Sequence, residues 1–164
     1  MQNNLYFICP TDHLEPIIDK KFGHKNYYIT SLGNSIVFDQ ASVCEVNELL
    51  NTKNIKNIFF VLSSTNRILG EVMVDDQKNS LDLSLFQKRI KTQMKCAKEI
   101  WQPAHYEFLT FSYHLNDQFE DLRRKLSSIR IHQPSIKGLI YSPIDDSFKN
   151  IYTNMYRVTY VGVY

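Results

Sequence analysis

Apolar runs of strand length alternate along this chain with stretches in which apolar residues recur at helical spacing. The strongest strand signal is the continuous apolar run at residues 58–62, which is typical of a central strand buried on both faces. The other segments that predict strands are residues 5–9, 27–30, 136–141 and 148–152. The alternation predicts an α/β fold with a mainly parallel central sheet flanked by helices, followed by a C-terminal hairpin or edge strands.

Helical spacing and end signals predict the helices. They are expected over residues 14–21, 42–50, 84–100 and 115–126. Asp12 is expected to cap the first helix and Gly23 to close it, while Ser42-x-x-Glu45 predicts a capping box at the start of the second. Residues 108–111 fit either a strand or the apolar start of a helix, and the form of the tyrosine-rich tail stays open.

Length, charge and cysteine usage exclude several function classes. A chain of 164 residues is expected to form a single domain over residues 1–164. A net charge of +2 provides no broad field for nucleic acid, and no apolar stretch reaches the roughly 20 residues that a membrane span needs. Three cysteines at unrelated spacings, Cys9, Cys44 and Cys96, do not resemble a disulfide framework. We therefore expect a cytoplasmic protein with reduced thiols that binds neither nucleic acid nor membrane.

Two polar segments that follow predicted strands contain the candidate chemistry. The first strand ends in Cys9-Pro10-Thr11-Asp12-His13, and the central strand leads into Ser63-Ser64-Thr65-Asn66-Arg67. Loops at strand ends of open α/β sheets often bind ligands, so the second segment is able to hydrogen-bond a small anion or polar ligand. The same residues equally fit a polar loop that caps the next helix.

The order and spacing of these segments resemble the β-class carbonic anhydrases over about residues 5–152. That family begins with a strand ending in Cys-x-Asp-x-Arg, continues with an Arg-Asn-x-Gly-Asn turn, and later has a Gly-His-x-x-Cys-Gly loop. Here the turn keeps only Gly33 and Asn34, while His114 to Leu122 resembles a late helix and Ile136 to Tyr141 the last strand. The resemblance implies a β-carbonic anhydrase-like fold and a homodimer.

The resemblance also implies that most of the zinc ligands have been replaced. Cys9 matches one ligand cysteine, but the ligand histidine becomes Ser63 and the other ligand cysteine becomes Asn66. A register shifted by one residue gives Ser64 and Arg67, which are no better as zinc ligands. A catalytic zinc needs about three ligands from Cys, His or carboxylate, and hydroxyl or amide groups are poor substitutes.

Two further positions have changed, since Thr11 and His13 stand where the family has its Asp–Arg pair. We therefore expect no metal, no cofactor and no hydration of carbon dioxide. The residues of this vestigial site are Cys9, Thr11, Asp12, His13, Ser63, Asn66 and Arg67.

Three hypotheses for the function follow. The preferred one is a non-catalytic carbonic anhydrase-like protein with a binding or structural role through the vestigial cleft or the homodimer surface. The second is an enzyme with altered chemistry, either thiol-dependent at Cys9 with help from His13, or dependent on a substitute metal site. That site would combine Cys9, Asp12 and His13 with one of the other histidines, which are His24, His105, His114 and His132. The third is a true zinc carbonic anhydrase.

The simplest interpretation of Cys9 itself is a small buried hydrophobic residue at a strand end.

Overall fold

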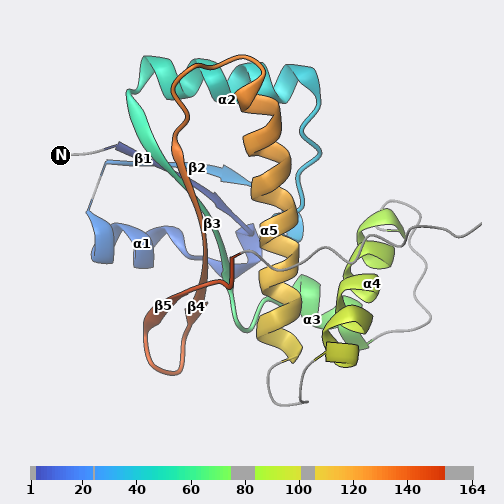
Figure 1. Cartoon of the computed structure of the whole chain (residues 1–164). Helices are drawn as coiled ribbons and strands as arrows, with labels where there is room; N and C mark the ends of the chain where they lie inside the picture. Colours follow the sequence, from blue (N-terminus) through green and yellow to red (C-terminus); the bar gives the residue numbers. More distant parts are fainter. Residues whose placement is uncertain (1–2, 24, 75–83, 101–105, 154–164) are drawn as a thin grey trace, which may run out of the picture.

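The structure is a computed structural model that describes residues 3–23, 25–74, 84–100 and 106–153. One five-stranded sheet, in the order β2-β1-β3-β4-β5, organises these residues (Figure 1). Its strands are β1 (Asn3–Ile8), β2 (Asn26–Thr30), β3 (Ile55–Ser63), β4 (Ser135–Ser142) and β5 (Ser147–Asn150). The first four strands pair in parallel and β5 pairs antiparallel with β4, which confirms the mainly parallel sheet and the C-terminal hairpin.

Five α-helices and two short 3-10 helices connect the strands within the described ranges. They are η1 (Pro10–Asp12), α1 (Glu15–Phe22), η2 (Leu32–Asn34), α2 (Gln40–Thr52), α3 (Arg67–Val74), α4 (Ser84–Ile100) and α5 (Tyr106–Ser127). Residues 108–111 belong to α5, so the strand alternative for them was wrong. The eight residues of α3 were not predicted as a helix. None of the helices in these ranges has the length and apolar content that crossing a membrane would require.

The two faces of the sheet are covered unequally. Alternate residues of a strand point to opposite faces, so Leu5 and Phe7 join one core while Tyr6 and Ile8 join another. The first core contains residues from α2, α3, α4 and α5, and the second contains residues from α1 alone among the α-helices. The larger core is therefore the one beneath the long helix α5 (Figure 1).

The start of α1 differs from the prediction and its end agrees with it. Asp12 does not cap α1, because it lies in η1 and the residue before the helix is Leu14, which provides no side-chain cap. Gly23 closes the helix, with φ of 94° and its N–H donating to the carbonyl oxygen of Asp19. The carboxylate of Asp12 is therefore available for hydrogen bonds outside α1.

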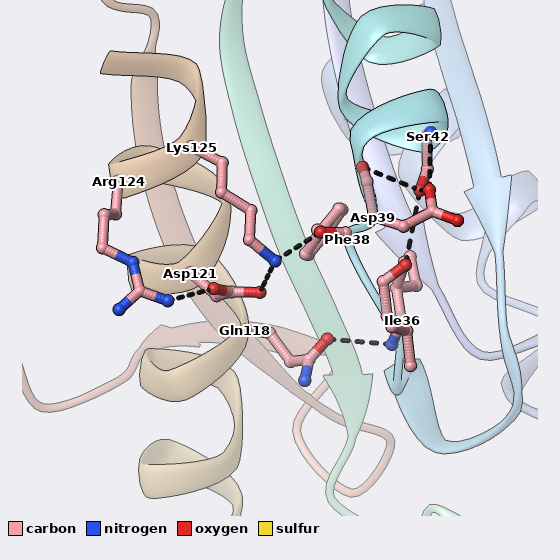
Figure 2. Close-up of polar contacts among 9 residues, drawn as sticks. Ile36, Phe38, Asp39, Ser42, Gln118, Asp121, Arg124 and Lys125 are labelled. Atoms are coloured by element: carbon pink, nitrogen blue, oxygen red, sulfur yellow. Dashed lines mark hydrogen bonds and ion pairs between the residues drawn. The ribbon is translucent and has the colours of Figure 1, made fainter. Parts of the chain in front are cut away.

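The predicted capping box at Ser42 was wrong, because α2 begins two residues earlier, at Gln40. Asp39 is the N-cap, and its carboxylate accepts from the backbone N–H of Ser42 at 2.8 Å (Figure 2). Helix α5 contacts the same stretch of chain. Lys125 Nζ donates to the carbonyl oxygen of Phe38, and Gln118 Oε1 accepts from the N–H of Ile36 at 2.9 Å.

Candidate functional site

The two polar segments meet at the carboxyl edge of the sheet, between β1 and β3. This is a switch point of the topology, because β2 lies on one side of β1 and β3 on the other, and open α/β sheets commonly bind ligands at such a crevice. Asp12 connects the two segments directly. Its Oδ2 accepts from the backbone N–H of Ser63 at 2.8 Å, and its Oδ1 accepts from Asn66 Nδ2 at 2.7 Å.

Asn66 uses both ends of its amide group. Besides donating to Asp12, it accepts from the backbone N–H of Leu69 at 2.9 Å and so caps the start of α3. Ser63 Oγ lies 2.9 Å from Thr65 Oγ1 and accepts from the Thr65 N–H at 3.2 Å. These contacts support the interpretation of residues 63–66 as a capping loop. We call Asp12, Ser63, Thr65 and Asn66 the Asp12 cluster.

Burial and hydrogen bonding act on Asp12 in opposite directions. Burial raises the pKa of its carboxyl group, and the hydrogen bonds from Ser63 and Asn66 lower that pKa. A partly buried carboxylate between two donors loses both bonds if either segment moves away. Asp12 therefore fastens η1 to the loop before α3.

Cys9 is fully buried and belongs to the larger core. Its Sγ lies 3.0 Å from Thr11 Oγ1 and accepts from the backbone N–H of Gly33 at 3.1 Å. This burial agrees with the interpretation of Cys9 as a small buried residue. It counts against direct attack by the thiol on a substrate at the surface.

The two remaining predicted site residues lie outside the cluster. His13 is exposed on the left-handed turn that ends η1, with φ of 50°. Arg67 is exposed and forms an ion pair at 2.9 Å with Glu71, one turn along α3. The predicted residues that come together are therefore Asp12, Ser63 and Asn66, with Cys9 and Thr11 beside them.

The donor set does not fit a zinc ion. The positions that the resemblance assigns to the two missing ligands hold a hydroxyl and an amide, and Asp12 is already engaged with both residues. Across the described part of the chain, no three His, Cys, Asp or Glu side chains gather as metal ligands would. The substitute site is therefore not assembled there: His114 is buried, His132 is exposed, and His24 and His105 lie outside the described residues.

The turn η2 is a part of the site that the sequence analysis left without a role. Asn34 Nδ2 donates to the carbonyl oxygens of Phe7, at 2.8 Å, and Val61, at 3.0 Å, so one amide bridges β1 and β3. His114 Nε2 donates to the carbonyl oxygen of Gly33 at 2.8 Å. Burial lowers the pKa of His114 to about 4, against the raising effect of the backbone of Gly33 and Asn34. The only sequence signal was the Gly33-Asn34 pair, two residue types that tolerate the left-handed φ of 61° and 51° found here.

Comparisons with solved structures place the fold among the β-carbonic anhydrases. The wild-type β-carbonic anhydrase CafD from Aspergillus fumigatus superposes with a TM-score of 0.69 at 17% identity, over 93% of this chain and 90% of that one. A β-carbonic anhydrase from Sordaria macrospora, described as tetrameric, gives 0.72 at 12% identity, over 92% and 80%. The Coccomyxa enzyme in complex with acetazolamide gives 0.71 at 15% identity, over 92% and 72%.

No protein-family model and no curated protein matches the sequence. The chain has a β-carbonic anhydrase-like fold, as the resemblance in its sequence implied. Identities this low establish the fold alone.

Proposed function

We propose that this chain is a non-catalytic carbonic anhydrase-like protein in which a hydrogen-bonded cluster has replaced the zinc site. One observation supports this most strongly. The carboxylate of Asp12 accepts hydrogen bonds from Ser63 and Asn66, the residues at the two substituted ligand positions. The bond from Ser63 comes from its backbone N–H, while its hydroxyl contacts Thr65. Of the two substituted side chains, it is the Asn66 amide that would have to release Asp12 before meeting a metal.

Loss of the metal removes the chemistry that hydrates carbon dioxide. A catalytic zinc lowers the pKa of its bound water to about 7 and so supplies hydroxide at neutral pH. Neither the Ser63 hydroxyl nor the Asn66 amide does this. Cys9, which matches the one ligand position that keeps its cysteine, is buried and lacks the two partner ligands.

The role left to such a site is binding or structural. A groove of about 1330 Å³ opens beside the cluster, and its lining includes the polar residues Ser64, Thr65 and Asn66 and the apolar residues Val72, Met73 and Phe111. Its lining also includes Arg67, Glu71 and Glu107, so side chains of both charge signs border it, and a small polar ligand is the proposed occupant. A mixed groove of this size fits a small molecule with one polar and one apolar end.

The assembly and location of the protein belong to the same proposal. We propose one domain over residues 1–164 that pairs as a homodimer in the cytoplasm. The description of the Sordaria macrospora relative as tetrameric is in keeping with association of this fold. The free thiols of Cys9 and Cys44 are in keeping with a reducing compartment.

A carbon dioxide hydration assay on protein dialysed against zinc tests the proposal. We expect the rate to equal that of buffer with the same zinc concentration. Hydration above that background, lost on chelation and restored by zinc, would establish the third hypothesis in place of this one.

A further inference from the structure

The turn η2 fills the crevice between β1 and β3, and we call Leu32–Asn34 the plug. Its Asn34 amide bridges the carbonyl oxygens of Phe7 and Val61, and the N–H of Gly33 donates to Cys9 Sγ. Gly33 also packs tightly against the helices, because a Cβ atom there would lie 2.8 Å from Phe86 Cζ. The plug therefore covers both Cys9 and the place where this topology usually binds ligands.

The chain is anchored on both sides of the plug. Before it, the N–H of Ser31 donates to the carbonyl oxygen of Ile8 at 3.1 Å. After it, Gln118 accepts from the N–H of Ile36, and Lys125 donates to the carbonyl oxygen of Phe38 (Figure 2). These anchors lie outside the plug, so opening of the plug would break the bonds of Gly33 and Asn34 named above, together with the bond from His114 Nε2 to the Gly33 carbonyl oxygen.

Buried polar atoms in the closed plug and beside it would gain hydrogen-bond partners from water. Within the described residues, Ser31 Oγ, Asn34 Oδ1 and His114 Nδ1 are buried and have no hydrogen-bond partner. A buried polar atom without a partner costs free energy comparable to a lost hydrogen bond, so exposing these atoms to water lowers the cost of opening.

We propose that the plug opens locally while the sheet stays folded, and that its opening uncovers Cys9 and the crevice between β1 and β3. The proposal is independent of the proposed function, because it concerns access to the crevice and holds with or without a metal. Local opening of this kind has a lower free energy than global unfolding and exposes little surface.

Thiol labelling in urea tests the proposal. In a Cys44→Ser/Cys96→Ser variant, Cys9 is the only thiol, and its rate of reaction with a disulfide reagent reports its exposure. Opening of the plug predicts labelling that changes less than about threefold between 0 and 1 M urea, because the surface exposed is small. Labelling that rises about tenfold or more per molar, in parallel with global unfolding, would overturn the proposal.

Two matched asparagine variants locate the opening. Asn34→Ala removes the bridge to β1 and β3, and we expect Cys9 labelling without urea to accelerate about tenfold or more. Asn26→Ala removes hydrogen bonds to Asp19 and Gly23, away from the plug, and is expected to leave the rate within about twofold. Equal acceleration by both variants would contradict a local event. If Asn34→Ala fails to fold, the urea dependence of the parent variant decides alone.

Discussion

Two neighbouring regions at the carboxyl edge of the sheet satisfy their polar groups to different degrees. In the Asp12 cluster, both carboxylate oxygens of Asp12 and both ends of the Asn66 amide have partners. At the plug, Ser31, Asn34 and His114 each keep a buried atom without one. The Asp12 cluster connects η1 to the end of β3, and the plug connects β1 to β3, so the difference lies in how completely each connection is made. The Asp12 cluster is expected to be the rigid connection and the plug the loose one.

Under the proposed function, the site has changed its use without a change of fold. Metal ligands need free electron pairs that converge on one point, whereas the Asn66 side chain directs a donor at Asp12, beside the donor from the Ser63 backbone N–H. The result connects segments 51 residues apart in the sequence, as a bound metal would. Stability is then the property that mutation of this site should change most.

The largest expected effect is that of Asp12→Ala. It leaves the Ser63 N–H and the Asn66 amide without their acceptor, and we expect a loss of about 3 kcal/mol in the free energy of unfolding, measured in urea. The matched control is Asp121→Ala on α5, which removes partly exposed ion pairs to Arg124 and Lys125 and should cost at most about 1 kcal/mol. Equal losses in the two variants would show that the cluster is no stronger than a surface ion pair.

The second effect is a dependence of stability on pH that comes from His114. Its folded pKa, about 4, lies below the unfolded value of 6.5, so the unfolded chain binds more protons between these values. Stability contributed by neutral His114 is complete above pH 6.5 and is lost as the pH falls toward 4. We expect a loss of about 2 kcal/mol between about pH 7 and about pH 5.

The variant that isolates this titration is His114→Gln, which should remove the slope over the same pH interval. His132→Gln, at an exposed position, should leave the slope in place. If the slope persists in His114→Gln, the buried histidine is not its source.

The smallest effect is the difference in stability lost between two helix caps. Asn66→Ala removes the cap of α3 and a donor to Asp12, and we expect it to cost about 2 kcal/mol. Asp39→Ala removes the cap of α2 alone, outside the cluster, and should cost less. Urea unfolding of both variants measures the difference, and a larger loss for Asp39→Ala would argue that Asn66 acts only as a cap.

The sequence predicted those parts of the fold in which the local pattern of a segment determines its secondary structure. The apolar run at 58–62 became the core of β3, and the helix predicted at residues 84–100 has the bounds found in α4. The order of segments also matched the fold family. No bounds were predicted for the short helix α3, because eight residues offer little periodicity and the loop before it fits a helix cap and a ligand loop equally well.

The sequence grouped Asp12, Ser63 and Asn66 together with His13 and Arg67, which lie outside the Asp12 cluster, and it did not predict the hydrogen bonds of the cluster. Cys9, Asp12, Ser63 and Asn66 were all named from the sequence, yet Asp12 was expected to cap α1. An aspartate before a helix fits a cap by local rules, and the competing donors come from residues 51 and 54 positions away. The partnerless atoms of the plug depend on packing in three dimensions, so no local pattern reveals them.

The most direct test of the central claim measures zinc bound per chain after dialysis, in the natural sequence and in a Ser63→His/Asn66→Cys variant. The variant restores, beside Cys9, the two donor types that the resemblance assigns to these positions. We predict essentially no zinc in the natural chain and about one ion per chain in the variant. About one tightly held zinc ion per natural chain would contradict the account.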